Sequence, residues 1–149
     1  MHKEVLDKNQ LELLPFVKLF KQEFYLAGGT AIALHIGHIR SIDFDLFKPK
    51  ALNHKSIVSK ILASGYPYTI TRRETEQMNI IIRDVMFTFC EYPFQIASDS
   101  SFSGLLRLPD LEVLAAMKAY ALGRRSKWKD YVDMYFILKD FLTIEQISE

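Results

Sequence analysis

A Gly-Gly-Thr turn early in the chain has the residue types that phosphate binding requires. Gly28, Gly29 and Thr30 directly follow the apolar run 24–27, which is typical of a buried strand. Glycines let a backbone approach a phosphate without a clash at Cβ, and a helix that starts there offers free N–H groups. The segment predicts a phosphate-binding turn, with the Thr30 hydroxyl donating to phosphate or capping the helix. A tight turn without a ligand is the alternative.

Two aspartates further along the chain have the spacing of a metal site. Asp43 and Asp45 lie in the run 41–47, where acidic and apolar residues alternate. Residues i and i+2 of a strand share a face, and two carboxylates on one face repel unless a cation lies between them. Mg²⁺ prefers oxygen ligands and commonly binds carboxylates together with substrate phosphates. The run therefore predicts a strand with a metal-binding face, and a solvated strand edge is the alternative.

Apolar periodicity and breaker residues predict the elements that position both motifs. We expect a single domain over residues 1–149, with a core at about 24–92 and C-terminal helices at about 109–141. Residues 97–104 are expected to form a loop. The expected strands are 24–27, 41–47, 66–72, 77–82 and 85–92. The expected helices lie within 5–23, where Pro15 interrupts the segment or starts its second helix, and at 30–36, 53–64, 109–122 and 128–141.

The composition is that of an ordinary globular domain. The chain has 149 residues, of which 49% are hydrophobic, and a formal net charge of +1, whereas a dedicated nucleic-acid binder is strongly basic. The single cysteine, Cys90, is expected to be a buried structural thiol in a reducing compartment. Because there is no signal-peptide pattern and no apolar run near the ~20 residues that span a membrane, we expect a cytoplasmic protein without a membrane partner.

The turn Gly28-Gly29-Thr30 followed by the pair Asp43 and Asp45 resembles the signature of the DNA polymerase β-like nucleotidyltransferase superfamily. In that superfamily a Gly-Gly or Gly-Ser turn precedes an Asp-x-Asp pair. More closely, the chain resembles the AbiEii/AbiGii-type toxin family of nucleotidyltransferases over about residues 24–138. The resemblance implies a nucleotidyltransferase fold of the α/β (α+β) class, a mixed β-sheet flanked by helices with a C-terminal helical part. The matching segments are Tyr25–Ala31, Gly37-His38, Ser41, Asp43–Phe47, Leu114–Ala121 and Lys127–Tyr135.

This resemblance implies roles for the residues of the first two motifs. Asp43 and Asp45 are implied catalytic residues that bind Mg²⁺ (or Mn²⁺), while Gly28, Gly29 and Thr30 hold the triphosphate.

The later matching segments imply three more site residues. Lys118 and Asp133 are implied catalytic residues, and Lys118 and Asp130 are implied to contact the nucleotide. A helical lysine that faces a phosphate pocket can neutralise the charge that develops in phosphoryl transfer. The alternatives are a snorkelling surface lysine and aspartates that pair with neighbouring cations.

The chain departs from the family pattern in three ways. Some family members have a third metal carboxylate on a later strand, and the alignment puts Thr88 there, with Glu91 on the opposite face of a regular strand. The Arg that usually follows Gly-His is Ile39 here, with Arg40 one place later. The C-terminal extension of longer relatives is not present in this sequence, so we expect a reduced acceptor-binding region.

A histidine pair and two basic segments are further candidates for binding a metal or phosphate groups. His35 and His38 are three residues apart, but no cysteine or third histidine accompanies them in sequence, so a zinc site is not expected. Arg72-Arg73 and the segment 124–129 are basic, and the second is the better candidate to touch RNA or the triphosphate.

We therefore expect a nucleotidyltransferase that moves a nucleotide from a nucleoside triphosphate to an RNA (tRNA) or protein acceptor. By resemblance it could be the toxin of a toxin–antitoxin pair, with an antitoxin protein as partner. The alternative is a catalytically impaired nucleotide-binding module of the same fold, which Thr88 favours. A haloacid dehalogenase-type phosphatase also uses Asp-x-Asp, but without an upstream Gly-Gly-Thr turn and helix.

Overall fold

The computed structural model describes residues 1–124 and 127–148 and contains a mixed seven-stranded sheet. The strand order is β3-β4-β5-β2-β1-β7-β6. Strand β2 lies at its centre, antiparallel to β1 and parallel to β5. The strands are β1 (Tyr25–Ala27), β2 (Phe44–Lys48), β3 (Thr69–Arg73), β4 (Gln77–Ile82), β5 (Val85–Glu91), β6 (Ser100–Phe102) and β7 (Leu106–Leu108).

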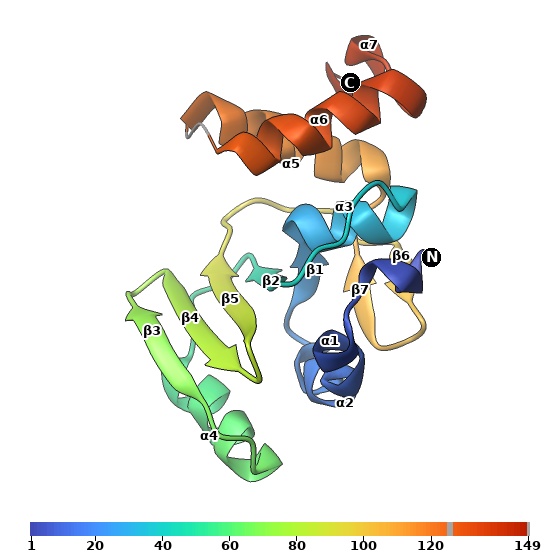
Figure 1. Cartoon of the computed structure of the whole chain (residues 1–149). Helices are drawn as coiled ribbons and strands as arrows, with labels where there is room; N and C mark the ends of the chain where they lie inside the picture. The colour runs from blue at the N-terminus through green and yellow to red at the C-terminus, as the bar shows by residue number, and fades with distance from the viewer. Residues whose placement is uncertain (125–126, 149) are drawn as a thin grey trace.

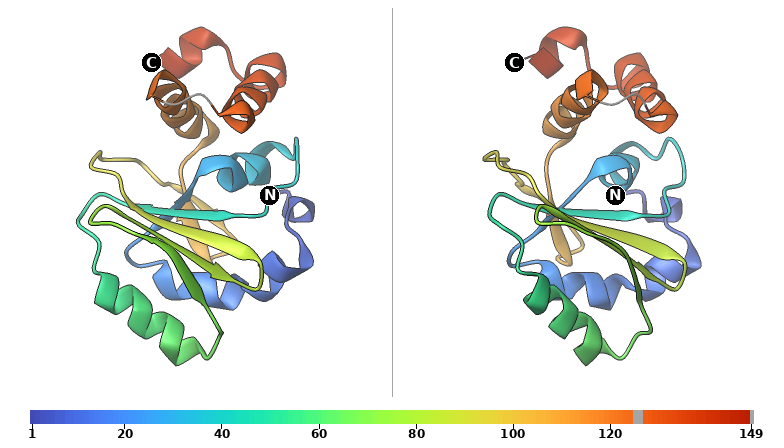
Figure 2. Two further views of the ribbon diagram at one scale, coloured as in Figure 1. Left: turned by 60° about the vertical axis from the view of Figure 1, so that its left-hand side comes forward. Right: turned by 90° about the vertical axis from the view of Figure 1, so that its left-hand side faces the viewer.

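Helices cover both faces of this sheet (Figure 1). The N-terminal helices and α4 lie against one face, while α3 lies on the other, with α5, α6 and α7 stacked beyond it (Figure 2). None of the described helices is long and apolar enough to cross a membrane. The helices are η1 (Lys3–Val5), α1 (Lys8–Glu12), α2 (Leu14–Val17), η2 (Lys18–Phe20), α3 (Gly28–Ile36), α4 (His54–Ser64), α5 (Leu111–Arg124), α6 (Trp128–Asp140) and α7 (Ile144–Ser148).

Alternation along β2 and β5 gives the sheet one apolar and one polar face. In β2, Phe44 and Leu46 are buried, whereas Asp45 points to the opposite face. On the apolar face, Phe87 and Phe89 of β5 contact aromatic rings of the N-terminal helices at centroid distances of 5.2 and 4.9 Å. Such packing forms an aromatic core on this face, while Asp45 and Thr88 lie on the opposite face, on the side of α3.

Most predicted elements are confirmed, with shifted ends. The Asn53 side chain caps α4 by accepting from the Ser56 N–H at 3.0 Å, and β4 has its predicted bounds. The strand expected over 41–47 begins only at Phe44, so Asp43 lies just before it. The helix expected to end at residue 122 continues through Arg124.

One sequence expectation is wrong. Residues 97–104 were expected to form a loop, but they contain β6, which pairs with β7 and extends the sheet beyond β1. Both strands have three residues, and β6 consists of Ser-Ser-Phe, so neither has the length or alternation that periodicity can detect.

The Gly28 backbone approaches the Asp45 carboxylate too closely for any side chain. Gly28 has φ +72°, in the left-handed region, and a Cβ built there would lie 2.0 Å from Asp45 Oδ2. Glycine tolerates both conditions because it has no Cβ. The turn therefore brings the start of α3 against the acidic face of β2.

We expect Gly28→Ala to destabilise the protein more than Gly65→Ala. Both glycines have positive φ, but a Cβ at Gly65 meets nothing within 4 Å. Gly65→Ala should therefore cost about 1 kcal/mol of unfolding free energy from backbone strain alone. Gly28→Ala adds the clash with Asp45 and should cost roughly 2 kcal/mol or more. Urea denaturation of both variants is the measurement, and equal losses would contradict the close packing.

Candidate nucleotide and metal site

Register across three neighbouring strands brings the predicted acidic residues beside the glycine turn. Asp45 pairs with Ala27 of β1, the residue that precedes Gly28, and with Thr88 of β5. Neighbouring strands lie about 4.8 Å apart and paired residues share a face. Thr88 is therefore the neighbour of Asp45 on β5.

A cleft with two lobes lies above this face, between the sheet and the C-terminal helices. The polar lobe has a volume of about 350 Å³ and is lined by both aspartates, the glycine turn and several cations. The apolar lobe, of about 260 Å³, shares Asp45, Phe47, Cys90 and Lys118 with the polar lobe. Other residues that line the polar lobe are Gly29, Thr30, Ser41, Asp43, Arg72, Thr88, Lys127, Lys129 and Asp130.

Asp43 lies just before β2, so strand pairing does not hold it in place. Hydrogen bonds to its backbone carbonyl do so instead. The buried Thr30 hydroxyl donates to the Asp43 carbonyl and accepts from the Ser41 hydroxyl at 2.6 Å. Gln10 Nε2 also donates to the Asp43 carbonyl, at 3.4 Å, and Lys129 Nζ donates to Ser41 Oγ at 3.5 Å. Thr30 thus positions a predicted metal ligand, and a role for its hydroxyl as a phosphate ligand stays a prediction.

Lys118 joins the two long C-terminal helices through buried charges. Its Nζ on α5 donates to Asp130 Oδ1 of α6 at 2.7 Å and lies 3.1 Å from Asp133 Oδ2, an ion-pair contact without hydrogen-bond alignment. His38, from the segment after α3, donates from Nε2 to Asp133 Oδ1 at 2.7 Å. Asp133 is fully buried and Lys118 is 7% exposed. Because buried charges need partners, this cluster fixes the helices over the core.

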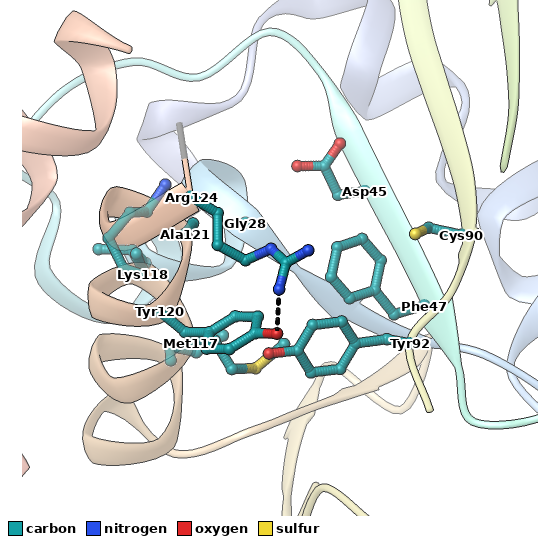
Figure 3. Close-up of a pocket in the computed structure, with 12 residues that line it drawn as sticks. Gly28, Asp45, Phe47, Cys90, Tyr92, Met117, Lys118, Tyr120, Ala121 and Arg124 are labelled. Carbon is teal, nitrogen blue, oxygen red and sulfur yellow. Dashed lines mark hydrogen bonds between the residues drawn. The ribbon is translucent and has the colours of Figure 1, made fainter. Parts of the chain in front are cut away.

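Aromatic side chains line the apolar lobe. The Phe47 and Tyr92 rings stack with centroids 5.4 Å apart at 27°. Arg124 donates to the Tyr120 hydroxyl at 2.9 Å, and in Figure 3 the rings gather below Asp45 while Arg124 reaches toward them. Burial raises the pKa of the Tyr92 phenol, so its hydroxyl stays protonated. The lobe can take a flat apolar group with a few polar edges.

The structure brings the predicted site residues together around this cleft. Gly28, Gly29, Thr30, Asp43, Asp45, Lys118 and Asp130 line one or both lobes. Asp133 lies behind them, in contact with Lys118. Within the described residues, no group of three or more His, Cys, Asp or Glu side chains could hold a metal ion alone.

One sequence interpretation needs correction. Cys90 was expected to be a buried structural thiol, but it is half-buried and lines both lobes. His35 and His38 do not face a common site, because His35 Nε2 contacts the Pro109 carbonyl at 2.9 Å while His38 contacts Asp133.

Sequence reasoning missed the supporting residues of the site. Ser41 and His38 were matched by resemblance but given no role, although each makes a buried contact with a site residue. The aromatic wall was also missed, because its rings come from β2, the end of β5 and α5. The sequence did contain one signal for the wall of the polar lobe. Polar Gln77 and Asn79 alternate with apolar residues that are buried in β4, and both line the polar lobe.

No protein-family model matches the chain. A curated relative, an uncharacterized protein of Aquifex aeolicus (strain VF5), is 29% identical over 125 residues. The match covers 78% of this chain and 58% of the relative, so the chain spans little more than half of that protein's length.

Several solved structures share the fold at low sequence identity. The Megavirus polyadenylate synthase has a TM-score of 0.66 at 14% identity, over 89% of this chain and 32% of its own. The antibiotic-resistance factor ANT(2'')-Ia has a TM-score of 0.67 at 13% identity, over 95% of this chain and 89% of its own. MenT4, a nucleotidyltransferase toxin of Mycobacterium tuberculosis H37Rv, has a TM-score of 0.59 at 15% identity, over 92% of this chain and 60% of its own.

These likenesses confirm the predicted fold class: the chain has the nucleotidyltransferase fold, a mixed sheet flanked by helices. The narrower resemblance to the AbiEii/AbiGii-type toxins rests on the sequence motifs and stays a prediction.

We expect Lys118→Met to cost about 3–5 kcal/mol of unfolding free energy, because it leaves the buried carboxylates of Asp130 and Asp133 without their shared cation. Lys127→Met is the matched control, since Lys127 also lines the polar lobe but is exposed. The control should change stability by no more than about 0.5 kcal/mol. Denaturant melts of both variants test this, and similar losses would show that the cluster does not hold the helices.

Proposed function

We propose that the chain is a Mg²⁺-dependent nucleotidyltransferase that transfers a nucleotide from a nucleoside triphosphate to a hydroxyl of an RNA or protein acceptor. The observation that carries the proposal is the polar lobe, where Asp43 and Asp45 face the glycine turn and the start of α3. The fold shared with known nucleotidyltransferases supports it.

The donor set of the polar lobe fits a divalent metal that shares its ligands with a triphosphate. Asp43 and Asp45 supply carboxylate oxygens on one side of the lobe, and Mg²⁺ commonly combines one or two carboxylates with substrate phosphates. These two residues would hold the Mg²⁺ (or Mn²⁺). The metal would neutralise phosphate charge and orient the reacting phosphate.

The surrounding residues suit the rest of a nucleoside triphosphate. Helix α3 has no side-chain cap at its start, so its first N–H groups are available to phosphate oxygens. Lys127 and Lys129 add positive charge around the lobe. The base would lie in the apolar lobe against Phe47 and Tyr92, where aromatic faces stack with it.

The proposed reaction is a displacement at the α-phosphorus. The acceptor hydroxyl oxygen forms a bond to the α-phosphorus, the bond to the bridging oxygen breaks, and pyrophosphate leaves. The hydroxyl proton passes to solvent water, because Asp43 and Asp45 are both assigned to the metal. Arg124, Lys127 and Lys129 line the cleft and would contact an RNA acceptor through its phosphates.

A toxin of a toxin–antitoxin pair is the biological setting that the sequence resemblance favours. MenT4, a toxin with this fold, is consistent with that setting. An antitoxin protein would then be the partner that restrains the activity.

We expect the double variant Asp43→Asn/Asp45→Asn to lose Mg²⁺-dependent triphosphate binding and transfer. The substitutions keep the size of both side chains but remove two negative charges that the metal requires. Stability should hold or rise, because the like charges repel each other in the absence of a cation. Calorimetric titration with a nucleoside triphosphate, in Mg²⁺ and in EDTA, measures the change.

The matched control is Asp99→Asn/Asp140→Asn, which removes the same charge from exposed positions outside the cleft. The control should bind as the unmodified protein does. Equal triphosphate affinity in Mg²⁺ and in EDTA, or undiminished transfer by the Asp43/Asp45 variant, would overturn the site assignment.

A second function, nucleotide binding without efficient turnover, is favoured by one observation. Thr88 occupies the position beside Asp45 where some related sequences have a third carboxylate. Threonine cannot supply the negative charge of that carboxylate, which helps to activate the acceptor hydroxyl. Among the described residues that line the polar lobe, the acidic ones are Asp43, Asp45 and Asp130.

Thr88→Asp separates the two functions. If the missing carboxylate limits turnover, the variant should transfer nucleotide about a hundredfold faster at unchanged triphosphate affinity. Thr88→Asn is the control, since it changes shape in a similar way without the charge. Transfer that is rapid in the unmodified protein and falls in Thr88→Asp would contradict the binding-only function.

A further inference from the structure

Helix α6 presents a stripe of large aromatic and apolar side chains to solvent. The exposed residues of this α6 stripe are Trp128, Tyr131, Tyr135 and Leu138. They follow one another at intervals of three or four residues, so they lie on one face of the helix. The opposite face carries the buried residues Asp130, Asp133 and Ile137. The stripe is therefore the outer face of α6, and Trp128 is 81% exposed on it.

The rings of the α6 stripe are of the kind that binds unpaired nucleobases. A contiguous exposed apolar surface generally marks an interaction site. Trp and Tyr rings stack on bases of any sequence, because every base has a π-face. From Trp128 to Leu138 the stripe is roughly 15 Å long at about 1.5 Å per helical residue. A strand stacked at about 3.4 Å per nucleotide would place roughly four nucleotides along it.

The acidic residues of α6 are mostly directed away from the stripe. Asp130 and Asp133 are buried on the opposite side of the helix, where both pair with Lys118 of α5. Asp140 is the remaining acidic residue of α6 and lies at its last position. A helix with three aspartates and two lysines thus leaves most of its negative charge inside the protein.

Exposed lysines accompany the rings. Lys129 and Lys139 of α6 are exposed, and Lys127 precedes the helix and is exposed as well. Lys139 Nζ lies 5.7 Å from the centroid of the Tyr135 ring. Rings combined with cations are the pattern of surfaces that bind single strands. The core of a protein–protein interface, in contrast, is depleted in lysine. The charge beside the stripe therefore favours a nucleic acid over a protein partner.

The α6 stripe begins beside the cleft. Lys127 and Lys129, the chain neighbours of Trp128, both line the polar lobe. A strand that lies along α6 would therefore have one end at the lobe where the triphosphate is proposed to bind.

We propose that the acceptor is a single-stranded RNA whose unpaired bases stack on Trp128, Tyr131 and Tyr135. Its phosphates contact the lysines beside these rings, and the end of the strand enters the polar lobe. This inference rests on the proposed nucleotidyl transfer, because it chooses the acceptor of that reaction and gives it a binding surface outside the cleft.

The test uses Trp128 as its own probe, because it is the only tryptophan of the chain. The protein is titrated with a short unpaired oligoribonucleotide in EDTA, without nucleoside triphosphate, and tryptophan fluorescence is recorded. We expect saturable quenching as bases stack on the ring. A duplex RNA of the same length should require at least about tenfold more for the same quenching, because its bases are paired and stacked on each other.

The double variant Tyr131→Ser/Tyr135→Ser should require at least about tenfold more single-stranded RNA for half-maximal quenching, because two stacking rings are lost. Leu62→Ser is the matched control, since it removes an exposed apolar side chain from α4, at the other end of the molecule (Figure 1). The control should bind RNA as the unmodified protein does. Both variants should melt at the temperature of the unmodified protein, because the altered side chains are exposed.

Three results would overturn the proposal. They are the absence of quenching by RNA, quenching that is unchanged in the double variant, and equal affinity for the duplex. Sedimentation velocity adds a fourth, because a dimer that the double variant converts to a monomer would make the stripe an interface between two copies of this chain.

Failure of the surface and failure of the proposed function give different results. RNA binding in EDTA should persist in Asp43→Asn/Asp45→Asn, because the α6 stripe does not need the metal. Saturable quenching without transfer to any acceptor would support the surface and contradict the transfer. Transfer to a protein acceptor without quenching by RNA would support the transfer and overturn the surface.

Discussion

The buried contact of Lys118 with Asp130 and Asp133 is the constraint on which the cleft depends. It joins α5 to α6, while His38 ties Asp133 to the segment that follows α3. Because these groups are buried, each needs its partner on the neighbouring element, and removal of one partner would leave an uncompensated charge or polar atom in the low-dielectric interior. The helical part is therefore fixed over the polar face of the sheet, and the cleft is the space that remains between them (Figure 2).

At the central strands, one face of the sheet forms the core and the other face lines the cleft. The side chains of Phe44, Phe87 and Phe89 form the aromatic core with the N-terminal helices, and the alternate positions, Asp45 and Thr88, face the cleft. Because strand side chains alternate, burying one set leaves the other set on the cleft side. A site built on such strands is held by the stability of the core itself, which suits the positioning of a metal and a triphosphate.

Local signals predicted the parts of this molecule that depend on adjacent residues. The strand–turn–helix around Gly28, the helix that follows Asn53 and strand β4 all follow from short-range chemistry. Parts that depend on tertiary partners could not be predicted in this way. The short strand β7 forms by pairing with β1, and β6 forms by pairing with β7. Cys90 faces the cleft because it is the register partner of Phe47. The contact between His38 and Asp133 joins residues 95 positions apart, which no local pattern encodes.

We propose that Asp43 and Asp45 hold a metal only together with the triphosphate. Crystals grown with Mn²⁺ and a non-hydrolysable nucleoside triphosphate test this directly through the anomalous scattering of manganese. We expect an anomalous peak between the two carboxylates, with the phosphates at the Gly28-Gly29 turn and the base in the apolar lobe. Nucleotide bound elsewhere on the protein, or manganese located away from both aspartates, would contradict this assignment.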